Sequence, residues 1–318
     1  MADLADILER LHVVALPMRV RFRGITTREL ALIEGPAGWG EFGPFLEYGP
    51  AEAAHWLAAG IAAAYRPLPG VRRARIPINA TVPAVPADSV PEVLARFPGA
   101  RTAKVKVAEP GQTLADDVAR VNAVRAAVPT VRVDANGGWT VDEAAAAARA
   151  LTVDGPLEYL EQPCATVREL AELRRRVDVP VAADESIRKA DDPLHVVRRG
   201  AADVAVLKVA PLGGVHAMLD IAAQIDIPIV VSSALDSAVG IGIGLVAAGA
   251  LPTLEHACGL GTGGLFGDDV AAPIVPVDGY LPAAAVVPDR DRIAALAAPP
   301  QRRQWWIDRV RECYPLLS

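Results

Sequence analysis

Three acidic residues are spaced so that they could share one cation. Asp134, Glu161 and Asp184 each end a short run of β-branched and aliphatic residues, and they lie 27 and 23 positions apart. If those runs are consecutive parallel strands, the three carboxylates meet at one edge of the sheet. Carboxylates at close range repel one another unless a cation lies among them, and an all-oxygen set without His or Cys selects a hard ion. The pattern predicts a Mg²⁺ site, with Mn²⁺ as the alternative metal.

Each of these acids also has a purely structural interpretation, which is that it caps the following helix or faces solvent. Glu158 and Glu185 compete for the same roles because they lie close to Glu161 and Asp184 in the chain. Strand alternation turns one member of each close pair away from the interior. We favour Glu161 because it ends its strand and has the same parity as Tyr159, which we expect to face inward. Glu185 remains an alternative to Asp184.

Three lysines flank the acids. Lys104 and Lys106 lie two positions apart on one predicted strand, so both ammonium groups point into the same interior. Each lowers the pKa of the other by repulsion, which moves Lys106 toward service as a base near neutral pH. Lys208 ends the sixth predicted strand, opposite the second in an eight-stranded barrel. The alternative is that the lysines only balance carboxylate charge. If they act on a substrate instead, a metal between lysines on opposite sides suits removal of a proton beside a substrate carboxylate.

The elements that must position these groups repeat through residues 71–265. A short β-branched run is followed each time by an alanine-rich amphipathic stretch, and strand ends recur every 23 to 28 residues. Alternating strands and helices require parallel strands with crossovers, and eight such units predict an α/β fold, a closed (β/α) barrel, over an open doubly wound sheet. Helices are predicted at 113–128, 141–151 and 167–177. The strands are predicted at 75–82, 102–107, 131–136, 157–161, 179–185, 203–208, 228–233 and 254–258.

The two ends of the chain fall outside this repeat. We expect residues 1–70 and the C-terminal segment 266–318 to join in one α+β domain that caps the barrel mouth. Strands are predicted at 11–22 and 28–34, and a glycine-rich turn at 38–41 precedes a helix at 51–65. The C-terminal segment contains a short strand-like stretch, a proline-rich connection and an amphipathic helix at 301–310.

Composition narrows the class of protein. The 318 residues include 32 basic and 38 acidic side chains, for a net charge of −6, which argues against a nucleic-acid partner. No apolar run reaches the roughly 20 residues needed to cross a bilayer, and the acidic start lacks the features of a secretory signal. Cys164, Cys258 and Cys313 are expected to be free, buried thiols. We expect a cytoplasmic protein whose partner is a small carboxylate; no particular oligomeric state is predicted.

A glycine-rich loop follows the last predicted strand, at residues 259–264. Bare backbone amides in such a loop can approach an anion. The loop is not a GxGxxG motif after a first strand, so dinucleotide binding is not expected. We interpret Gly261, together with Ser232 and Ser233, as holding a second substrate carboxylate. The serines lack the His and Asp partners that serine hydrolysis requires.

These motifs resemble the o-succinylbenzoate synthases, a family of the enolase superfamily, and most closely its actinobacterial type. The resemblance extends over nearly the whole chain, and its fourth strand reads Glu-Gln-Pro where other members can show Glu-Glu-Pro. The motifs that carry it are Leu16-Pro-Met-Arg-Val-Arg21, Gly38-Trp-Gly-Glu41, Lys104-Val-Lys106, Val133-Asp-Ala-Asn136, Leu160-Glu-Gln-Pro-Cys164, Ala183-Asp-Glu-Ser186, Leu207-Lys208 and Ser232-Ser-Ala-Leu-Asp-Ser237.

The resemblance implies a Mg²⁺-dependent lyase of menaquinone biosynthesis. Its reaction would be syn dehydration of 2-succinyl-6-hydroxy-2,4-cyclohexadiene-1-carboxylate to 2-succinylbenzoate. Lys106 would remove the α-proton and then, as its conjugate acid, assist loss of the hydroxyl. Lys208 would stabilise the enediolate from the opposite face. The implied metal ligands are Asp134, Glu161 and Asp184, and the implied substrate contacts are Arg23 on a closing loop, Lys104, Asn136, Ser232, Ser233 and Gly261.

A racemase or epimerase of N-succinylamino acids or dipeptides, from the same superfamily, is the alternative activity. It also needs two lysines on opposite faces of a metal, so the core motifs do not separate the two reactions. A third interpretation is a barrel without enzymatic activity that serves in binding or assembly.

Overall fold

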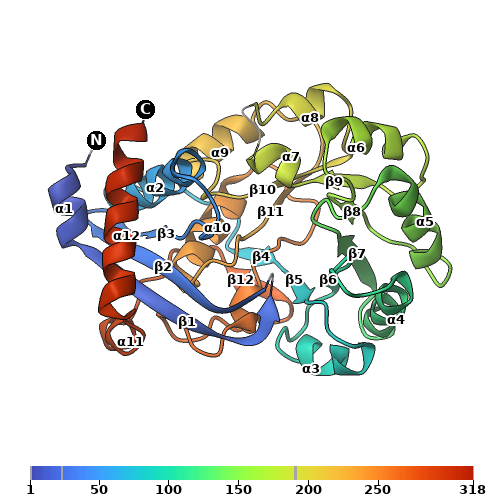
Figure 1. Cartoon of the computed structure of the whole chain (residues 1–318), viewed down its shortest axis with the longest axis horizontal. Helices are drawn as coiled ribbons and strands as arrows, with labels where there is room; N and C mark the ends of the chain where they lie inside the picture. The colour runs from blue at the N-terminus through green and yellow to red at the C-terminus, as the bar shows by residue number, and fades with distance from the viewer. Residues whose placement is uncertain (1, 23, 190–191, 318) are drawn as a thin grey trace.

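The computed structural model describes residues 2–22, 24–189 and 192–317. A sheet of seven parallel strands curls through its centre, in the order β11-β10-β9-β8-β7-β6-β5. Neighbours in the sheet are consecutive in the chain because each crossover returns the next strand to the same edge (Figure 1). The strands are β5 (Asn79–Val82), β6 (Thr102–Lys106), β7 (Thr130–Asp134), β8 (Leu160–Glu161), β9 (Val181–Ala183), β10 (Val204–Leu207) and β11 (Ile229–Val231).

The predicted eighth strand, 254–258, is not a strand in the structure. Two isolated parallel bridges take its place, one between Cys258 and Ile78 and the other between Gly259 and Ser232. These bridges join the last strand of the sheet to the start of the first, so the barrel is closed, as predicted. The segment pairs over too few residues on either side to build a ladder of its own.

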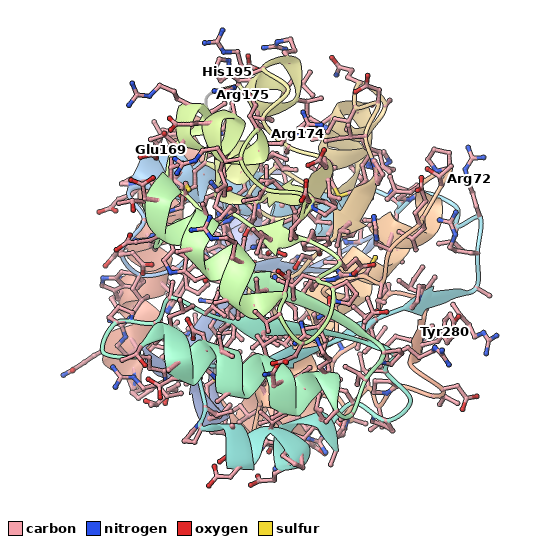
Figure 2. All side chains as sticks on the ribbon, turned by 90° about the vertical axis from the view of Figure 1, so that its right-hand side faces the viewer. Arg72, Glu169, Arg174, Arg175, His195 and Tyr280 are labelled. Carbon is pink, nitrogen blue, oxygen red and sulfur yellow. The ribbon has the colours of Figure 1, made fainter. Side chains whose placement is uncertain are left out.

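Helices cover the outside of the barrel (Figure 1). Those predicted at 113–128, 141–151 and 167–177 are present, and each begins at a threonine that forms a capping box with the acid three residues later. Figure 2 shows Arg174, Arg175 and His195 projecting from this outer face. The helices are α3 (Val90–Leu94), α4 (Leu114–Arg125), α5 (Val141–Leu151), α6 (Val167–Arg174), α7 (Glu185–Arg188), α8 (His195–Arg198), α9 (Val215–Ala222) and α10 (Ala238–Ala250), with 3₁₀ turns η1 (Ala87–Ser89) and η2 (Thr262–Leu265).

A buried ionic network crosses the barrel interior below the strand ends. The Arg132 side chain has no exposed surface and donates from Nε to Glu158 Oε2 (2.7 Å). Its Nη1 donates to Tyr159 Oη (2.7 Å) and to the Ala257 carbonyl (2.9 Å). His256 Nδ1 lies 2.9 Å from the other oxygen of Glu158. The guanidinium therefore ties β7 and β8 to the segment that closes the barrel.

An antiparallel sheet, β1-β2-β3, forms the body of the capping domain. The stretch predicted as a turn at 38–41 lies within a third strand, because it pairs antiparallel with β2. The helix α2 packs directly on this strand: a Cβ on Gly40 would lie 1.8 Å from the Gly60 carbonyl oxygen. Glycine at this position therefore marks a close approach of two backbones. The elements are α1 (Leu4–Glu9), β1 (Leu11–Phe22), β2 (Ile25–Gly35), β3 (Gly38–Phe42) and α2 (Pro50–Tyr65).

The C-terminal helix returns to this sheet. The Trp306 side chain on α12 (Pro300–Cys313) is fully buried against Phe42, with ring centroids 5.6 Å apart, and Ala298 N donates to the Val13 carbonyl (2.9 Å). Figure 1 shows α12 beside α2 and the β1-β2-β3 sheet. On these contacts we propose a capping domain built from residues 1–70 and the C-terminal segment. In this segment α11 (Arg290–Ala295) precedes α12, and η3 (Tyr314–Leu316) follows it.

The first predicted strand of the barrel differs from the prediction. The predicted strand at 75–82 divides in two, and its first part, β4 (Arg75–Pro77), pairs antiparallel with β12 (Tyr280–Pro282) instead of entering the barrel. The C-terminal segment therefore contacts the base of the barrel before it reaches the capping sheet. Pro77 has no N–H to continue the ladder, which fits the division at this point.

Cys164, Cys258 and Cys313 are free and buried, as predicted. In the described part of the chain, no helix combines the length and apolar character needed to cross a bilayer.

Candidate active site

The three acids predicted as metal ligands meet at the carboxyl ends of adjacent strands. Asp134 ends β7, Glu161 ends β8, and Asp184 directly follows β9. The register sets Asp134 opposite Glu161. All three side chains are buried, with exposed fractions of 0 to 1%. The spacing in the sequence thus placed the carboxylates together correctly.

Two lysine ammonium groups from β6 lie against these carboxylates. Lys104 Nζ lies 2.5 Å from Glu161 Oε1 and 3.1 Å from Asp134 Oδ2. Lys106 Nζ lies 2.5 Å from the same Asp134 oxygen. Both lysines point inward, as the alternation predicted. Lys104 therefore bridges two acids, whereas Lys106 contacts one.

Lys208 lies on the other side of the acids, because β7, β8 and β9 separate β10 from β6. Its Nζ is 2.6 Å from Asp184 Oδ2. The other oxygen of Asp184 accepts from Arg188 Nε (3.1 Å), and Arg188 Nη1 donates to Tyr48 Oη of the capping domain (3.0 Å). Arg188 was missing from the predicted site. The available signal was its position one helical turn after Asp184.

The rival acids are placed elsewhere. Glu185 pairs with Arg188 (2.6 Å) and accepts from Asn136 Nδ2 (3.1 Å) at the rim, so Asp184 and not Glu185 faces the lysines. Glu158 belongs to the network of Arg132 below the site.

The pKa values of the two lysines of β6 are shifted in opposite directions. Burial lowers the pKa of the Lys106 ammonium, and the charge of Lys104 lowers it further against the attraction of Asp134. Burial also opposes the charged form of Lys104, but the Asp134 and Glu161 carboxylates outweigh it and raise the pKa of Lys104. The repulsion expected between the two lysines is therefore outweighed at Lys104 by its two carboxylate neighbours. A lysine that bridges two acids remains charged, and the lowered pKa falls on Lys106 alone.

The carboxylates divide in a similar way. Burial would raise the pKa of the Asp134 carboxyl, but Lys104 and Lys106 hold it well below its usual range. For Glu161, burial dominates, and the charges of Asp134 and Asp184 add to it against Lys104, so its pKa rises to about 7. Glu161 is the acid whose negative charge is least compensated by the lysines.

The donor chemistry fits a hard cation. Among the described residues, no three His, Cys, Asp or Glu side chains are arranged as a metal cage, and the ammonium group of Lys104 lies between Asp134 and Glu161. The acids are nevertheless three oxygen donors from adjacent strands, which is the ligand type that Mg²⁺ prefers. The raised pKa of Glu161 points the same way, since burial and neighbouring carboxylates leave its charge in need of a positive ion.

A cavity of about 30 Å³ lies beside the acids and lysines. It is roughly the size of one water molecule, too small for a substrate as the side chains stand. Phe22, at the end of β1, belongs to the capping domain, and its ring centroid lies 5.5 Å from Lys106 Nζ. The predicted contact Arg23 lies outside the described residues. The cavity wall includes Lys104, Lys106, Asp134, Asn136, Lys208, Ser232 and Ser233 from the predicted set, with Phe22 and Phe45 from the capping domain.

The predicted substrate contacts are thus placed unequally. Asn136 Oδ1 accepts from Lys106 Nζ (2.7 Å), so it orients the ammonium. Ser233 Oγ lies 2.7 Å from Thr262 Oγ1, a wall residue that the sequence did not indicate. Gly261 does not line this cavity. It faces a separate cavity of about 630 Å³, and a Cβ there would meet the Asn79 carbonyl oxygen at 3.0 Å, which identifies Gly261 as a packing residue.

The capping domain also holds the loop that follows the serines. Glu41 on β3 accepts at Oε2 from Ser237 Oγ (2.5 Å) and from the backbone N of Ser237 and Gly240 (both 3.1 Å) at the start of α10. Arg28 on β2 donates from Nε to the Leu235 carbonyl (3.1 Å). These contacts between domains fix one wall of the site, and neither residue was predicted.

Comparison with known proteins identifies the family. Residues 13–64 match the model described as enolase N-terminal domain-like, and residues 90–290 match the enolase C-terminal domain-like model. A protein of Mycobacterium marinum named o-succinylbenzoate synthase is 78% identical over 316 residues, covering 99% of this chain and 97% of its own. The chain belongs to the o-succinylbenzoate synthase family. Two further proteins of this name show similar identity. The protein of Mycolicibacterium smegmatis is 78% identical over 314 residues, covering 99% of this chain and 98% of its own. The protein of Mycobacterium tuberculosis is 76% identical over 314 residues, covering 99% of this chain and 96% of its own.

As a member of the o-succinylbenzoate synthase family, the protein is a lyase of the hydro-lyase class. Solved structures support the fold. Muconate lactonizing enzyme from Pseudomonas fluorescens, complexed with muconolactone, superposes with a TM-score of 0.77 at 24% identity, covering 91% of this chain and 98% of that one. The enzyme from Pseudomonas putida gives 0.75 at 21% identity with the same coverage. At these identities the likeness shows the fold alone, a capped (β/α) barrel.

Proposed function

We propose that the protein catalyses the syn dehydration of 2-succinyl-6-hydroxy-2,4-cyclohexadiene-1-carboxylate to 2-succinylbenzoate and water, in cytoplasmic menaquinone biosynthesis. The observation that carries the proposal is the placement of Lys106 and Lys208 on either side of three buried carboxylates. The 76–78% identity to relatives named o-succinylbenzoate synthase supports the choice of substrate.

Asp134, Glu161 and Asp184 are the proposed ligands of Mg²⁺. When bound, the ion supplies positive charge that stabilises the negative charge developing on the substrate carboxylate. Lys104 holds Asp134 and Glu161 near each other and, because its pKa is raised, retains a charge that neutralises part of theirs.

Lys106 is the proposed base and then the proposed acid. Its neutral amine takes the α-proton, and the electron pair of the broken C–H bond moves into the substrate carboxylate to give an enediolate. The resulting ammonium returns the proton to the hydroxyl group as the C–O bond breaks, water leaves and the ring becomes aromatic. Because one side chain serves both steps, the proton and hydroxyl depart from the same face. The lowered pKa of Lys106 favours the first step.

Lys208 is proposed to stabilise the enediolate from the opposite side. It is buried, it pairs with Asp184, and it lines the cavity. A fixed ammonium in a site closed to water is worth more to a developing anion than one in solvent. Ser232 and Ser233, on the same wall, are proposed to receive the succinyl carboxylate.

The test is conversion of the cyclohexadiene precursor by purified protein, followed by ultraviolet absorbance of the aromatic product. Activity should require Mg²⁺, disappear with a chelator and return when Mg²⁺ is restored. Lys106→Ala should fold normally and lose at least about a hundredfold in kcat. Absence of product from the wild-type protein with Mg²⁺ would contradict the dehydration.

The opposed lysines also support a second candidate, a racemase or epimerase of N-succinylamino acids or dipeptides, since that reaction needs one base on each face of the α-carbon. Incubation with N-succinylamino acids in D₂O separates the two activities. A racemase incorporates deuterium at the α-carbon, whereas a dehydratase restricted to its own substrate leaves these compounds unlabelled.

A further inference from the structure

Gln162 follows Glu161 at the end of β8 and has no exposed surface. Its φ is +37°, in the left-handed region that a residue other than glycine occupies only when its surroundings enforce it. The backbone N donates to the Ala182 carbonyl of β9 (2.8 Å), and the backbone carbonyl accepts from Gly137 N after β7 (2.7 Å). The main chain of Gln162 is therefore held between the strands that carry the other two acids.

The side-chain amide uses both of its ends. Its Oε1 accepts from the backbone N of Asp184 (3.0 Å) and of Ser186 (3.1 Å). Its Nε2 donates to the Cys164 carbonyl (2.9 Å) and to Ser186 Oγ (2.8 Å). Turning the amide over would set N–H groups against N–H groups, so only this orientation satisfies the neighbours. A buried amide with every position matched fixes the chain around it.

Asp184 occupies the N-cap position of α7. An aspartate at that position ordinarily turns its carboxylate back to accept from an N–H of the first helical turn. Here the Asp184 side chain makes no capping bond and contacts Lys208 and Arg188 instead. The first-turn N–H of Ser186 is taken by the oxygen of Gln162.

We infer that Gln162 is a positioning residue that caps α7 in place of Asp184 and so leaves the Asp184 carboxylate to the proposed metal site. Without this substitute, the backbone N–H of Ser186 in the first turn of α7 competes with Lys208 and the cation for the same carboxylate. The inference rests on the proposed function, in which Asp184 is a ligand of Mg²⁺. A general consequence of such supporting bonds is that their loss weakens metal affinity or activity about 10- to 100-fold.

The experiment compares two substitutions at this position. Gln162→Leu keeps similar volume but removes the capping oxygen and both donors. Gln162→Glu keeps an oxygen that can accept from Ser186 N. The dissociation constant of Mg²⁺ is measured by calorimetry on the metal-free proteins, alongside kcat and KM. We expect Gln162→Leu to weaken Mg²⁺ binding and lower kcat by about 10- to 100-fold, and Gln162→Glu to recover part of that affinity.

The matched control is Thr166→Ala, which removes the N-cap of α6, where the Thr166 hydroxyl pairs with Glu169. It should lower thermal stability and leave Mg²⁺ affinity unchanged. If the wild-type protein neither binds Mg²⁺ nor forms product, the proposed function fails before Gln162 is tested. If the wild type binds Mg²⁺ and Gln162→Leu binds it within twofold, while losing as much thermal stability as Thr166→Ala, Gln162 is only structural. Should Gln162→Leu not fold, an affinity of Gln162→Glu within twofold of wild type supports the capping oxygen, and a larger loss than 100-fold contradicts it.

Discussion

Replacing Arg132 with methionine should destabilise the protein far more than the loss of a surface ion pair. The guanidinium has no exposed surface and donates to Glu158, to Tyr159 and to the carbonyl of Ala257. Methionine fills a similar volume but donates no hydrogen bond. Three polar groups, two of them at adjacent residues before β8 and one on the segment that closes the barrel, would then lose one partner together.

The size of the effect follows from those groups. Removing one member of a buried ion pair costs about 3–5 kcal/mol, because the remaining charge is left without its partner. Glu158 is 21% exposed at its side chain and keeps His256, which places the ionic part at the low end of that range. The unpaired carbonyl of Ala257 costs about 1–3 kcal/mol more. We therefore expect Arg132→Met to lower the free energy of unfolding by at least about 3 kcal/mol.

The assay is urea unfolding at neutral pH, with Arg174→Met as the control. Arg174 pairs with Asp203 at 2.5 Å, as closely as Arg132 approaches Glu158, but its side chain is 41% exposed and projects to the outside in Figure 2. Such a pair contributes about 0–1 kcal/mol. Equal losses in the two variants, or a loss below about 1 kcal/mol for Arg132→Met, would refute the reasoning that this network holds the barrel closed.

Three further outcomes are expected. Lys208→Ala should lower kcat by about a hundredfold or more with folding intact, and an unchanged kcat in the absorbance assay would remove Lys208 from the reaction. Burial, and then the charge of Asp236, raise the pKa of Glu41 to about 8. Its folded pKa lies above the unfolded value, so the associated stability is complete below about pH 4.5 and is lost as pH rises through 8. Glu41→Gln removes this titration, so its unfolding free energy should rise relative to that of the wild type as pH increases, by up to about 1.4 kcal/mol per pH unit in this window. Urea titrations of both proteins at pH 5, 6.5 and 8 measure the difference. A difference that stays constant over the three pH values contradicts the prediction. Gly40→Ala would place a Cβ 1.8 Å from the Gly60 carbonyl oxygen, so β3 and α2 would have to separate. The melting temperature should fall by several degrees. An unchanged melting temperature would show that the two elements can move apart freely.

The regular part of the fold could be predicted from local pattern. Strand and helix alternate with a nearly constant period, so the positions of Asp134, Glu161 and Asp184 on adjacent strands followed from spacing alone. The segment at 254–258 follows the same period but reads Leu-Glu-His-Ala-Cys, without the β-branched residues of most of the other strands, and it forms only bridges. Period alone therefore predicted its place in the barrel but not its pairing.

The electrostatics could be predicted only in part. Two lysines at alternate positions of one strand share a face, and that alone suggested that each lowers the pKa of the other. The structure shows that Lys104 has two carboxylate neighbours and Lys106 has one. Such counts depend on distances between strands, which sequence spacing does not contain.

Contacts between domains were beyond local pattern altogether. Glu41 and Arg28 look like ordinary residues of a two-sided sheet, and their partners lie about two hundred residues away in the chain. Arg188 and Gln162 would have been easier to predict, because each lies within four residues of a predicted ligand. Their function depends on which hydrogen bond each makes, and that emerges only once the backbone has been placed.

The contact between α12 and the β1-β2-β3 sheet joins the two ends of the chain, and this has a consequence for synthesis in the cell. The β1-β2-β3 sheet leaves the ribosome first, but α12, whose Trp306 packs on Phe42, emerges only after the whole barrel. Translation proceeds at about 5–20 residues per second, so this apolar sheet face waits many seconds for its cover. If the barrel folds as it is made, the face of the sheet that α12 covers would stay open to chaperones until the last residues are synthesised.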